Sequence, residues 1–423
     1  MINNANNAWV LLSAALILFM TVPALGLFYG GLVKRKNVLS VLMQSFASLI
    51  VVSLLWVIVG YSLAFSPTEL IPGVLGDFRW FFLNGIGPND PSPYTVSAPH
   101  APVAHLSFVL FQCMFAVITP AVISGALAER IKFSAFLTFS VVWLFVVYIP
   151  LAHMAWSQNG LFAKMGLMDY AGGTVVEINS GFSALAAALL LGRRTNLKPV
   201  PPHNLTFTLT GAAMLWFGWF GFNAGSGLAA DGLASSAFLM TNTAAAAAAL
   251  VWAGLDWILQ KKPTILGAAS GAVAGLVVIT PAAGFVSLPG ALLLGLVAGA
   301  VCYLFVVYIK NKLGYDDSLD AFGVHGIAGV LGTVGTGLFA APFITKAFGM
   351  NNGQGFSGLF FGNPTALGVQ SLATFTAMVW AFLGTFVIFL VLKVTMGLRV
   401  TPKEEAIGLD ITQHNERAYT VIE

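Results

Sequence analysis

The stretch AGGTVVEINSGFSALAAALLLG, residues 171–192, contains one charged side chain, Glu177, in an otherwise uncharged apolar run. At about 1.5 Å per residue, a helix over this stretch reaches across the roughly 30 Å hydrocarbon core of a bilayer. A carboxylate at mid-membrane costs roughly 2.5–3.5 kcal/mol, so it normally faces a partner or a pore. We therefore expect a membrane-spanning helix whose acid has a function.

The composition of the whole chain extends this expectation to many spans. The chain has 423 residues, of which 58% are apolar and 8% charged, and its mean hydropathy is +0.87. These values exclude an ordinary soluble domain, and long continuous apolar runs favour a helical bundle over a β-barrel. We expect an all-α polytopic membrane protein with eleven transmembrane helices, near residues 8–33, 38–65, 101–128, 133–154, 171–192, 203–228, 234–260, 264–281, 286–311, 322–341 and 365–397.

The basic residues predict the orientation of these helices. With the N-terminus outside, 16 of the 19 Lys and Arg residues, including Lys198, fall in cytoplasmic segments. The three exceptions are Arg79, Lys164 and Lys346. Cytoplasmic segments of membrane proteins carry an excess of Lys and Arg. The sequence therefore predicts a multi-pass protein of the cell (inner or plasma) membrane, with its N-terminus outside and its C-terminus in the cytoplasm.

An odd number of spans suggests an inverted repeat of five plus five helices with one peripheral helix. Repeat one covers about 8–192, repeat two about 203–341 and helix eleven about 365–397, and a polar tail follows over 398–423. Equivalent helices each carry an ionisable residue with an acid upstream, Asp169 before Glu177 and Asp320 before His325. The tail is either a regulatory or docking element or a solvated, disordered end.

His325 is the only histidine deep within a predicted span. A buried histidine that bonds a backbone carbonyl is a fair alternative, but two costly ionisable groups on equivalent helices favour one shared site with Glu177. Helix rise places Glu177 about 12 Å from Asp169 and His325 about 8 Å from Asp320. The two side chains would miss each other by about 10 Å unless both helices begin at recessed positions in the protein.

Aromatic residues and one serine complete the candidate binding residues. Phe111 and Phe115 are four residues apart, so we expect them stacked on one helical face, where they either close a pore or pack in the core. Aromatic faces together with a hydroxyl suit a small cation, and the residues of this kind are Trp156, Trp219, Phe222 and Ser226.

Asp169 precedes a helical run, and we expect it to cap that helix. The sequence contains no metal-ligand pattern, no phosphate-binding loop and no candidate nucleophile set, so we expect no metal, no cofactor and no enzyme activity.

Five segments of the chain resemble the ammonium transporter family (Amt/Mep/Rh), on its Amt/Mep branch. They are LFYGGL (27–32), GALAER (125–130), DYAGGT (169–174), GWFGFNAGS (218–226) and FGVHG (322–326). The resemblance implies an eleven-helix membrane domain over 1–397 with an inverted repeat, one pore in each protomer and a homotrimer.

The resemblance also implies roles for individual residues. Trp156, Phe222, Ser226 and Phe115 resemble the outer ammonium-recruitment site, and Phe111, Phe115 and Phe222 resemble the phenyl gate. Trp219 resembles a tryptophan that lines the pore, and Asp169 a structural acid. His325 matches the second histidine of the family's pore pair. Glu177 stands where the family normally has the first, as in some fungal members.

The tail segment GLDITQHNERAY (408–419) resembles the family's regulatory C-terminus, with Asn415 at a usual glycine position. In prokaryotes this tail accompanies binding of a PII signalling protein at the cytoplasmic face.

These residues predict electrogenic ammonium uptake. NH4+ is recruited outside and deprotonated, NH3 crosses a dry segment, and the proton passes through Glu177 and His325. Two alternatives are an ammonium sensor or transceptor with little flux, and an electroneutral NH3 channel.

Overall fold

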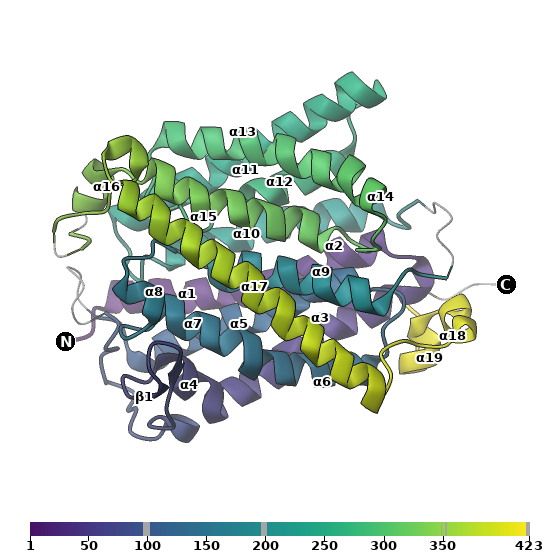
Figure 1. Cartoon of the computed structure of the whole chain (residues 1–423), viewed down its shortest axis with the longest axis horizontal. Helices are drawn as coiled ribbons and strands as arrows, with labels where there is room; N and C mark the ends of the chain where they lie inside the picture. The colour runs from purple at the N-terminus through teal and green to yellow at the C-terminus, as the bar shows by residue number, and fades with distance from the viewer. Residues whose placement is uncertain (96–101, 196–200, 348, 352, 420–423) are drawn as a thin grey trace.

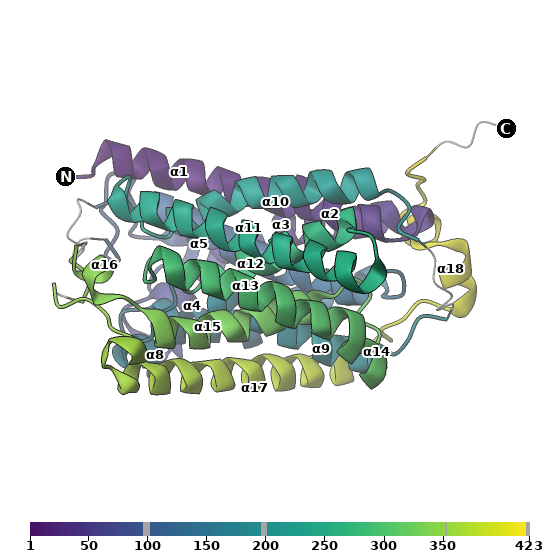
Figure 2. The same cartoon turned by 90° about the horizontal axis from the view of Figure 1, so that it is seen from above.

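The computed structural model describes residues 1–95, 102–195, 201–347, 349–351 and 353–419, so His100, Lys198 and the last four tail residues lie outside the described residues. Its helices run roughly along one long axis, and the N-terminus lies at the opposite end of the bundle from the tail helices α18 (Pro402–Ile407) and α19 (Leu409–His414) (Figure 1). Helix α17 (Pro364–Thr395) crosses one side of the bundle obliquely, whereas α1 (Asn4–Phe19) and α10 (Leu205–Gly225) form the opposite edge in the second view (Figure 2).

Ten helical segments of the described chain are long and apolar enough to cross a membrane. The eighth predicted span corresponds to a shorter apolar helix, α12, of 15 residues. α12 packs against α10, α11, α13 and α15. Its surroundings are therefore mostly protein, which explains why its hydrophobic run can be short.

Four of the first five spans consist of several consecutive helical elements, and the third is the single helix α5. They are α1 (Asn4–Phe19), η1 (Met20–Leu25) and α2 (Gly26–Leu32); η2 (Arg35–Asn37), α3 (Val38–Leu55), η3 (Trp56–Gly60) and α4 (Tyr61–Phe65); α5 (His105–Leu127); α6 (Phe133–Trp143), η5 (Leu144–Tyr148), α7 (Ile149–Trp156) and α8 (Leu161–Lys164); and η6 (Gly173–Ile178) and α9 (Asn179–Leu191).

The remaining elements follow the same pattern. They are α10 (Leu205–Gly225), α11 (Gly232–Gln260), α12 (Ile265–Ile279), α13 (Leu288–Leu304), η7 (Phe305–Ile309), α14 (Lys310–Leu313), η8 (Phe322–Gly326), α15 (Ile327–Phe339), α16 (Pro342–Ala347), η9 (Leu359–Phe361), α17 (Pro364–Thr395), α18 (Pro402–Ile407) and α19 (Leu409–His414).

The chain is mostly helical, but the expectation of an all-α protein is wrong in one detail. In the outer connection after α4, β1 (Glu69–Ile71) and β2 (Leu75–Gly76) form a small antiparallel sheet, and η4 (Phe81–Leu83) follows. His153 on α7 anchors this loop, since its Nε2 lies 3.0 Å from Glu69 Oε1 and its Nδ1 lies 2.9 Å from the Ala64 carbonyl. Neither Glu69 nor His153 lines the cavities that lie around Glu177 and His325.

The tail is docked in its described part, which contradicts the alternative of a solvated, disordered end. The Asp410 carboxylate accepts a 2.8 Å hydrogen bond from the Ser40 amide at the start of α3. Leu409 N–H donates to Asn37 Oδ1 over 2.9 Å, and Leu409 is fully buried. Asn415 ends α19 with φ 55°, a left-handed conformation that asparagine tolerates as glycine does.

Candidate functional site

Glu177 and His325 meet near the middle of the bundle. His325 Nδ1 lies 2.7 Å from Glu177 Oε2, and the two residues are 6% and 1% exposed, respectively. Each residue lies in a π-helical turn, Glu177 in η6 and His325 in η8. Such turns occur frequently at functional sites. The contact that we expected from the sequence is therefore present.

Helix caps explain how the two residues reach the same depth. Asp169 accepts hydrogen bonds from the amides of Gly172, Gly173 and Thr174, at 2.9, 2.6 and 2.9 Å. The capping role predicted for Asp169 is therefore confirmed, because these are the free amides at the start of η6.

Asp317 holds the position before η8 that Asp169 holds before η6, and the expected correspondence of Asp320 to Asp169 was wrong. Asp317 accepts from the amides of Ala321 and Phe322, at 3.1 and 2.7 Å, whereas Asp320 pairs with Lys310. Asp317 precedes His325 by the same number of residues as Asp169 precedes Glu177. Both ionisable groups thus lie about 12 Å beyond a capping acid, which removes the predicted difference in depth. The equal spacing was the signal in the sequence that identifies Asp317.

Glycines allow the two pore helices to cross in contact. A Cβ atom added at Gly181 would lie 2.2 Å from both the N and the Cα of Gly326. A Cβ at Gly329 would lie 2.9 Å from the Cβ of Glu177. Close backbone approach at small residues is the usual packing device of membrane helices. These glycines therefore set the separation across which Glu177 and His325 bond.

A cavity of about 170 Å³ lies on one side of the pair, and we call it the outer cavity after the orientation expected from the basic residues. Its lining includes Phe111, Gln112, Phe115, Trp156, Tyr170 and Ser226. The Ser226 hydroxyl donates to the Phe222 carbonyl over 2.8 Å, and the Trp156 indole N–H donates to the Asp169 carbonyl over 3.1 Å. Hence the serine oxygen is left as an acceptor, and the tryptophan contributes its ring surface.

The aromatic rings at the floor of this cavity differ from the expected arrangement. Phe111 and Phe115 are not stacked, because their ring planes meet at 66° with centroids 5.0 Å apart. Phe115 lies closer to Phe222, with centroids 4.4 Å apart and a tilt of 39°. The closer of these two ring contacts thus joins α5 to α10, and helical spacing within α5 alone did not reveal it.

Beyond Phe222 the space narrows to a mostly apolar pocket of about 10 Å³. It is lined by Met20, Leu25, Phe28, Ile118, Val122, Val176, Glu177, Leu215, Trp219, Phe222, Val273 and His325. This volume is about that of a single water probe. Trp219 also donates its indole N–H to Thr280 Oγ1 over 2.9 Å, which fixes the ring in the wall.

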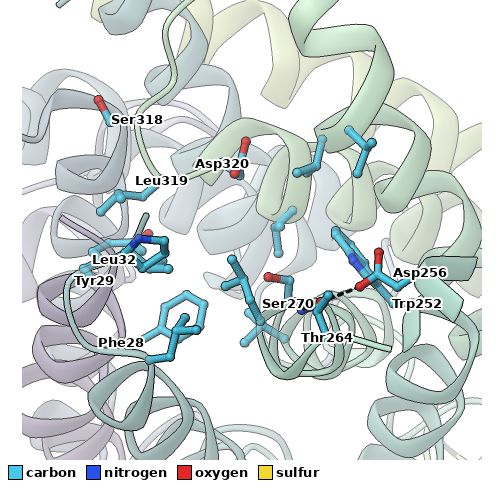
Figure 3. Close-up of a pocket in the computed structure, with 18 of the residues that line it drawn as sticks. Phe28, Tyr29, Leu32, Trp252, Asp256, Thr264, Ser270, Ser318, Leu319 and Asp320 are labelled. Carbon is cyan, nitrogen blue, oxygen red and sulfur yellow. Dashed lines mark hydrogen bonds between the residues drawn. The ribbon is translucent and has the colours of Figure 1, made fainter. Parts of the chain in front are cut away.

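On the other side of His325 lies a larger cavity of about 480 Å³. Figure 3 shows its polar wall, where Asp256 lies beside Trp252 and accepts a hydrogen bond from Thr264. Asp320 lies near the top centre of this view. His325 lines both this cavity and the narrow pocket. The imidazole therefore stands between the narrow pocket and the larger cavity, whose lining includes Asp256 and Asp320.

Charged residues join the two halves at the end of the bundle where the tail docks. Arg194 lies 2.8 Å from both Glu129 Oε2 and Asp316 Oδ1. Burial alone would raise the pKa of the Glu129 carboxyl, but the Lys34 amide and the Arg194 guanidinium outweigh burial and hold that pKa below its ordinary value. The pKa of Asp316 is likewise held low, because hydrogen bonds and charge from arginine outweigh its burial.

The described chain matches known proteins over nearly its whole length. The model of the Ammonium Transporter Family matches residues 8–419. The chain belongs to the ammonium transporter family. Members of this family are membrane transporters or channels and not enzymes.

Two relatives and one solved structure show how far this similarity reaches. An ammonium transporter of Bacillus subtilis is 48% identical over 405 residues, which cover 96% of each chain. The ammonium transporter Amt1 of Archaeoglobus fulgidus is 44% identical over 421 residues, 99% of this chain and all of that one. The crystal structure of Saccharomyces cerevisiae Mep2 superposes with a TM-score of 0.86 at 33% identity, over 95% of this chain and 91% of that one.

Proposed function

We propose that this member of the family carries out electrogenic ammonium uptake through a pore in each protomer. NH4+ enters the outer cavity, where the Trp156 ring and the Ser226 oxygen replace part of its hydration. It loses a proton below that cavity, and NH3 passes Phe115, Phe222 and the apolar segment. The proton travels separately, through the Glu177 carboxylate and the His325 imidazole, to the inner cavity.

The single observation that supports this function best is the 2.7 Å contact between Glu177 and His325 at the boundary of the dry segment. A passage that holds about one water cannot carry a hydrated cation, so charge needs another carrier. A carboxylate and an imidazole within hydrogen-bonding distance exchange a proton without large movement. Phe111, Phe115 and Phe222 act as the gate above this pair, Trp219 lines the passage, and Asp169 has a structural role.

The architecture that we propose has eleven spans, with α12 as the eighth, and an inverted repeat of five plus five helices. The placement of the N-terminus and the tail helices at opposite ends of the bundle requires an odd number of passes, which supports this count (Figure 1). The matching caps of Asp169 and Asp317 support the repeat. We place the N-terminus outside and the tail in the cytoplasm, and we expect a homotrimer in the cell membrane.

The tail is the proposed regulatory element. It joins the start of α3 through Asp410 and the segment after α9 through Glu405, which accepts from the Thr195 amide over 2.6 Å. A partner of the PII class that binds at the cytoplasmic face would therefore contact elements connected to both halves of the pore.

Currents in proteoliposomes under an ammonium gradient test the proposal. We expect a current that follows ammonium, is absent with K+ and is lost in His325→Ala. Full current in His325→Ala refutes the relay. Flux of NH3 without current identifies an electroneutral channel. Ammonium binding with negligible flux identifies a sensor and refutes the transport proposal.

A further inference from the structure

The outer cavity contains two polar side chains without a described hydrogen-bond partner. Tyr170 Oη and Gln112 Oε1 are both buried and unpaired among the described residues. Both residues line the same cavity as Ser226 and Trp156. A buried polar atom without a partner is destabilising, so such atoms at a cavity commonly bind a ligand or an ordered water.

The Tyr170 hydroxyl is held in position by the backbone around it. A Cβ atom added at Gly284 would lie 2.1 Å from Tyr170 Cε2, so the chain lies directly against the ring. A Cβ at Gly227 would lie 2.8 Å from the hydroxyl oxygen itself. Gly227 follows Ser226, so the tyrosine and serine oxygens belong to the same corner of the cavity. The hydroxyl is therefore positioned next to the serine acceptor.

The Gln112 carboxamide is oriented differently, because no described hydrogen bond fixes either of its ends. Gln112 lies on α5, three residues before Phe115, and is 9% exposed. The terminal amide torsion of glutamine is soft, so the side chain can present its oxygen to a cation at little cost. It thus supplies an adaptable acceptor on the helix that also carries Phe111 and Phe115.

We propose that Tyr170 and Gln112 are binding residues for ammonium in the outer cavity. The inference rests on the proposed transport function. The Tyr170, Gln112 and Ser226 oxygens accept three N–H bonds of the cation, and the Trp156 ring faces the fourth. These four contacts replace the hydration of a tetrahedral donor and leave few buried oxygens unpaired. Methylammonium has three N–H bonds, so it can satisfy the same three oxygens with its methyl group against the Trp156 ring.

The test compares the half-saturating concentrations of ammonium and methylammonium in proteoliposome currents. We expect Tyr170→Phe and Gln112→Met each to raise the value for ammonium about tenfold, which corresponds to about 1.4 kcal/mol, because each removes one contact with a charged ligand. The value for methylammonium rises by a similar factor, because its three N–H bonds use the same oxygens. The maximal current changes little, since the relay pair is untouched.

Two matched controls remove buried, unpaired groups that do not line the outer cavity. Tyr148 Oη and both ends of Gln44 also have no described partner, so Tyr148→Phe and Gln44→Met repeat the same chemistry elsewhere. The inference is wrong if both cavity variants keep the wild-type half-saturation, or if the controls shift as much. A wild-type protein without ammonium current refutes the transport function instead, which keeps the two failures apart. If one of the two cavity variants fails to assemble, the half-saturating concentration of the other variant tests the inference.

Discussion

Glu177→Gln is the most direct test of the proton pathway, because it changes the charge of the side chain and keeps its shape. The amide oxygen can still accept from His325 Nδ1, so the 2.7 Å contact and the packing against Gly329 need not change. What the variant loses is the carboxylate that accepts a proton and stabilises a charged imidazole. We therefore expect a folded protein whose current is reduced.

The size of the reduction follows from the contact itself. A hydrogen bond between a protonated imidazole and a carboxylate contributes about 1.5–3 kcal/mol, and exchange for a neutral amide removes most of this stabilisation. The state in which the imidazole is protonated is then less populated by roughly 10- to 150-fold. If the proton crosses through this pair, the ammonium current falls by a similar factor.

The assay is the peak current of proteoliposomes with equal protein content under an inward ammonium gradient. Glu69→Gln is the matched control, because Glu69 also pairs with a histidine, His153, but outside the pore. We expect near-normal current in Glu69→Gln. The reasoning is refuted if Glu177→Gln retains the wild-type current, or if both variants lose current equally.

Arg194→Met leaves the buried carboxylates of Glu129 and Asp316 without their shared cation. The free energy of unfolding should fall by about 3 kcal/mol, measured as a lower Tm in detergent. Arg193→Met, at an exposed arginine, should change Tm little. Both carboxyl pKa values are depressed, so their stabilisation is complete at neutral pH and is lost as the pH falls below about 4; the Tm of Arg194→Met should therefore depend less on acid than that of the wild type. Asp410→Ala removes the cap that the tail provides to α3, and should weaken the docking of the tail by about 1 kcal/mol. Limited proteolysis of the tail should therefore be faster, and an unchanged digestion rate contradicts the docked tail. Gly181→Ala forces two helices apart and should cost about 1–3 kcal/mol, whereas Gly254→Ala, in open space, should be neutral or slightly stabilising; equal Tm values for both would contradict the close crossing.

Much of the fold could be predicted from the sequence, because crossing a bilayer imposes long apolar runs that are visible in one dimension. Ten of the expected spans appear as long helices close to their predicted bounds, and the remaining one corresponds to the shorter apolar helix α12. The cap by Asp169 was also predictable, since a carboxylate directly before a helical run has few other roles. These are local properties of consecutive residues.

The distances across the bundle could not be predicted in the same way. The sequence suggested that Glu177 and His325 share a site but placed them at different depths, because it took Asp320 as the capping acid when Asp317 caps the helix. It paired Phe111 with Phe115, although the closer ring is that of Phe222 on another helix. Helical periodicity describes neighbours on one helix only, so it contains no information about which residue the next helix presents.

The sequence by itself therefore determined that this is a helical membrane protein with an unusual acid in its fifth span. Only the tertiary structure decided what that acid contacts, which rings face each other and which oxygens remain unpaired in the outer cavity. The physical reason is that burial in lipid acts on every residue of a span, whereas a 2.7 Å contact depends on how closely two helices approach. That approach is set by glycines such as Gly181 and Gly326, which lie close together in space but far apart along the chain.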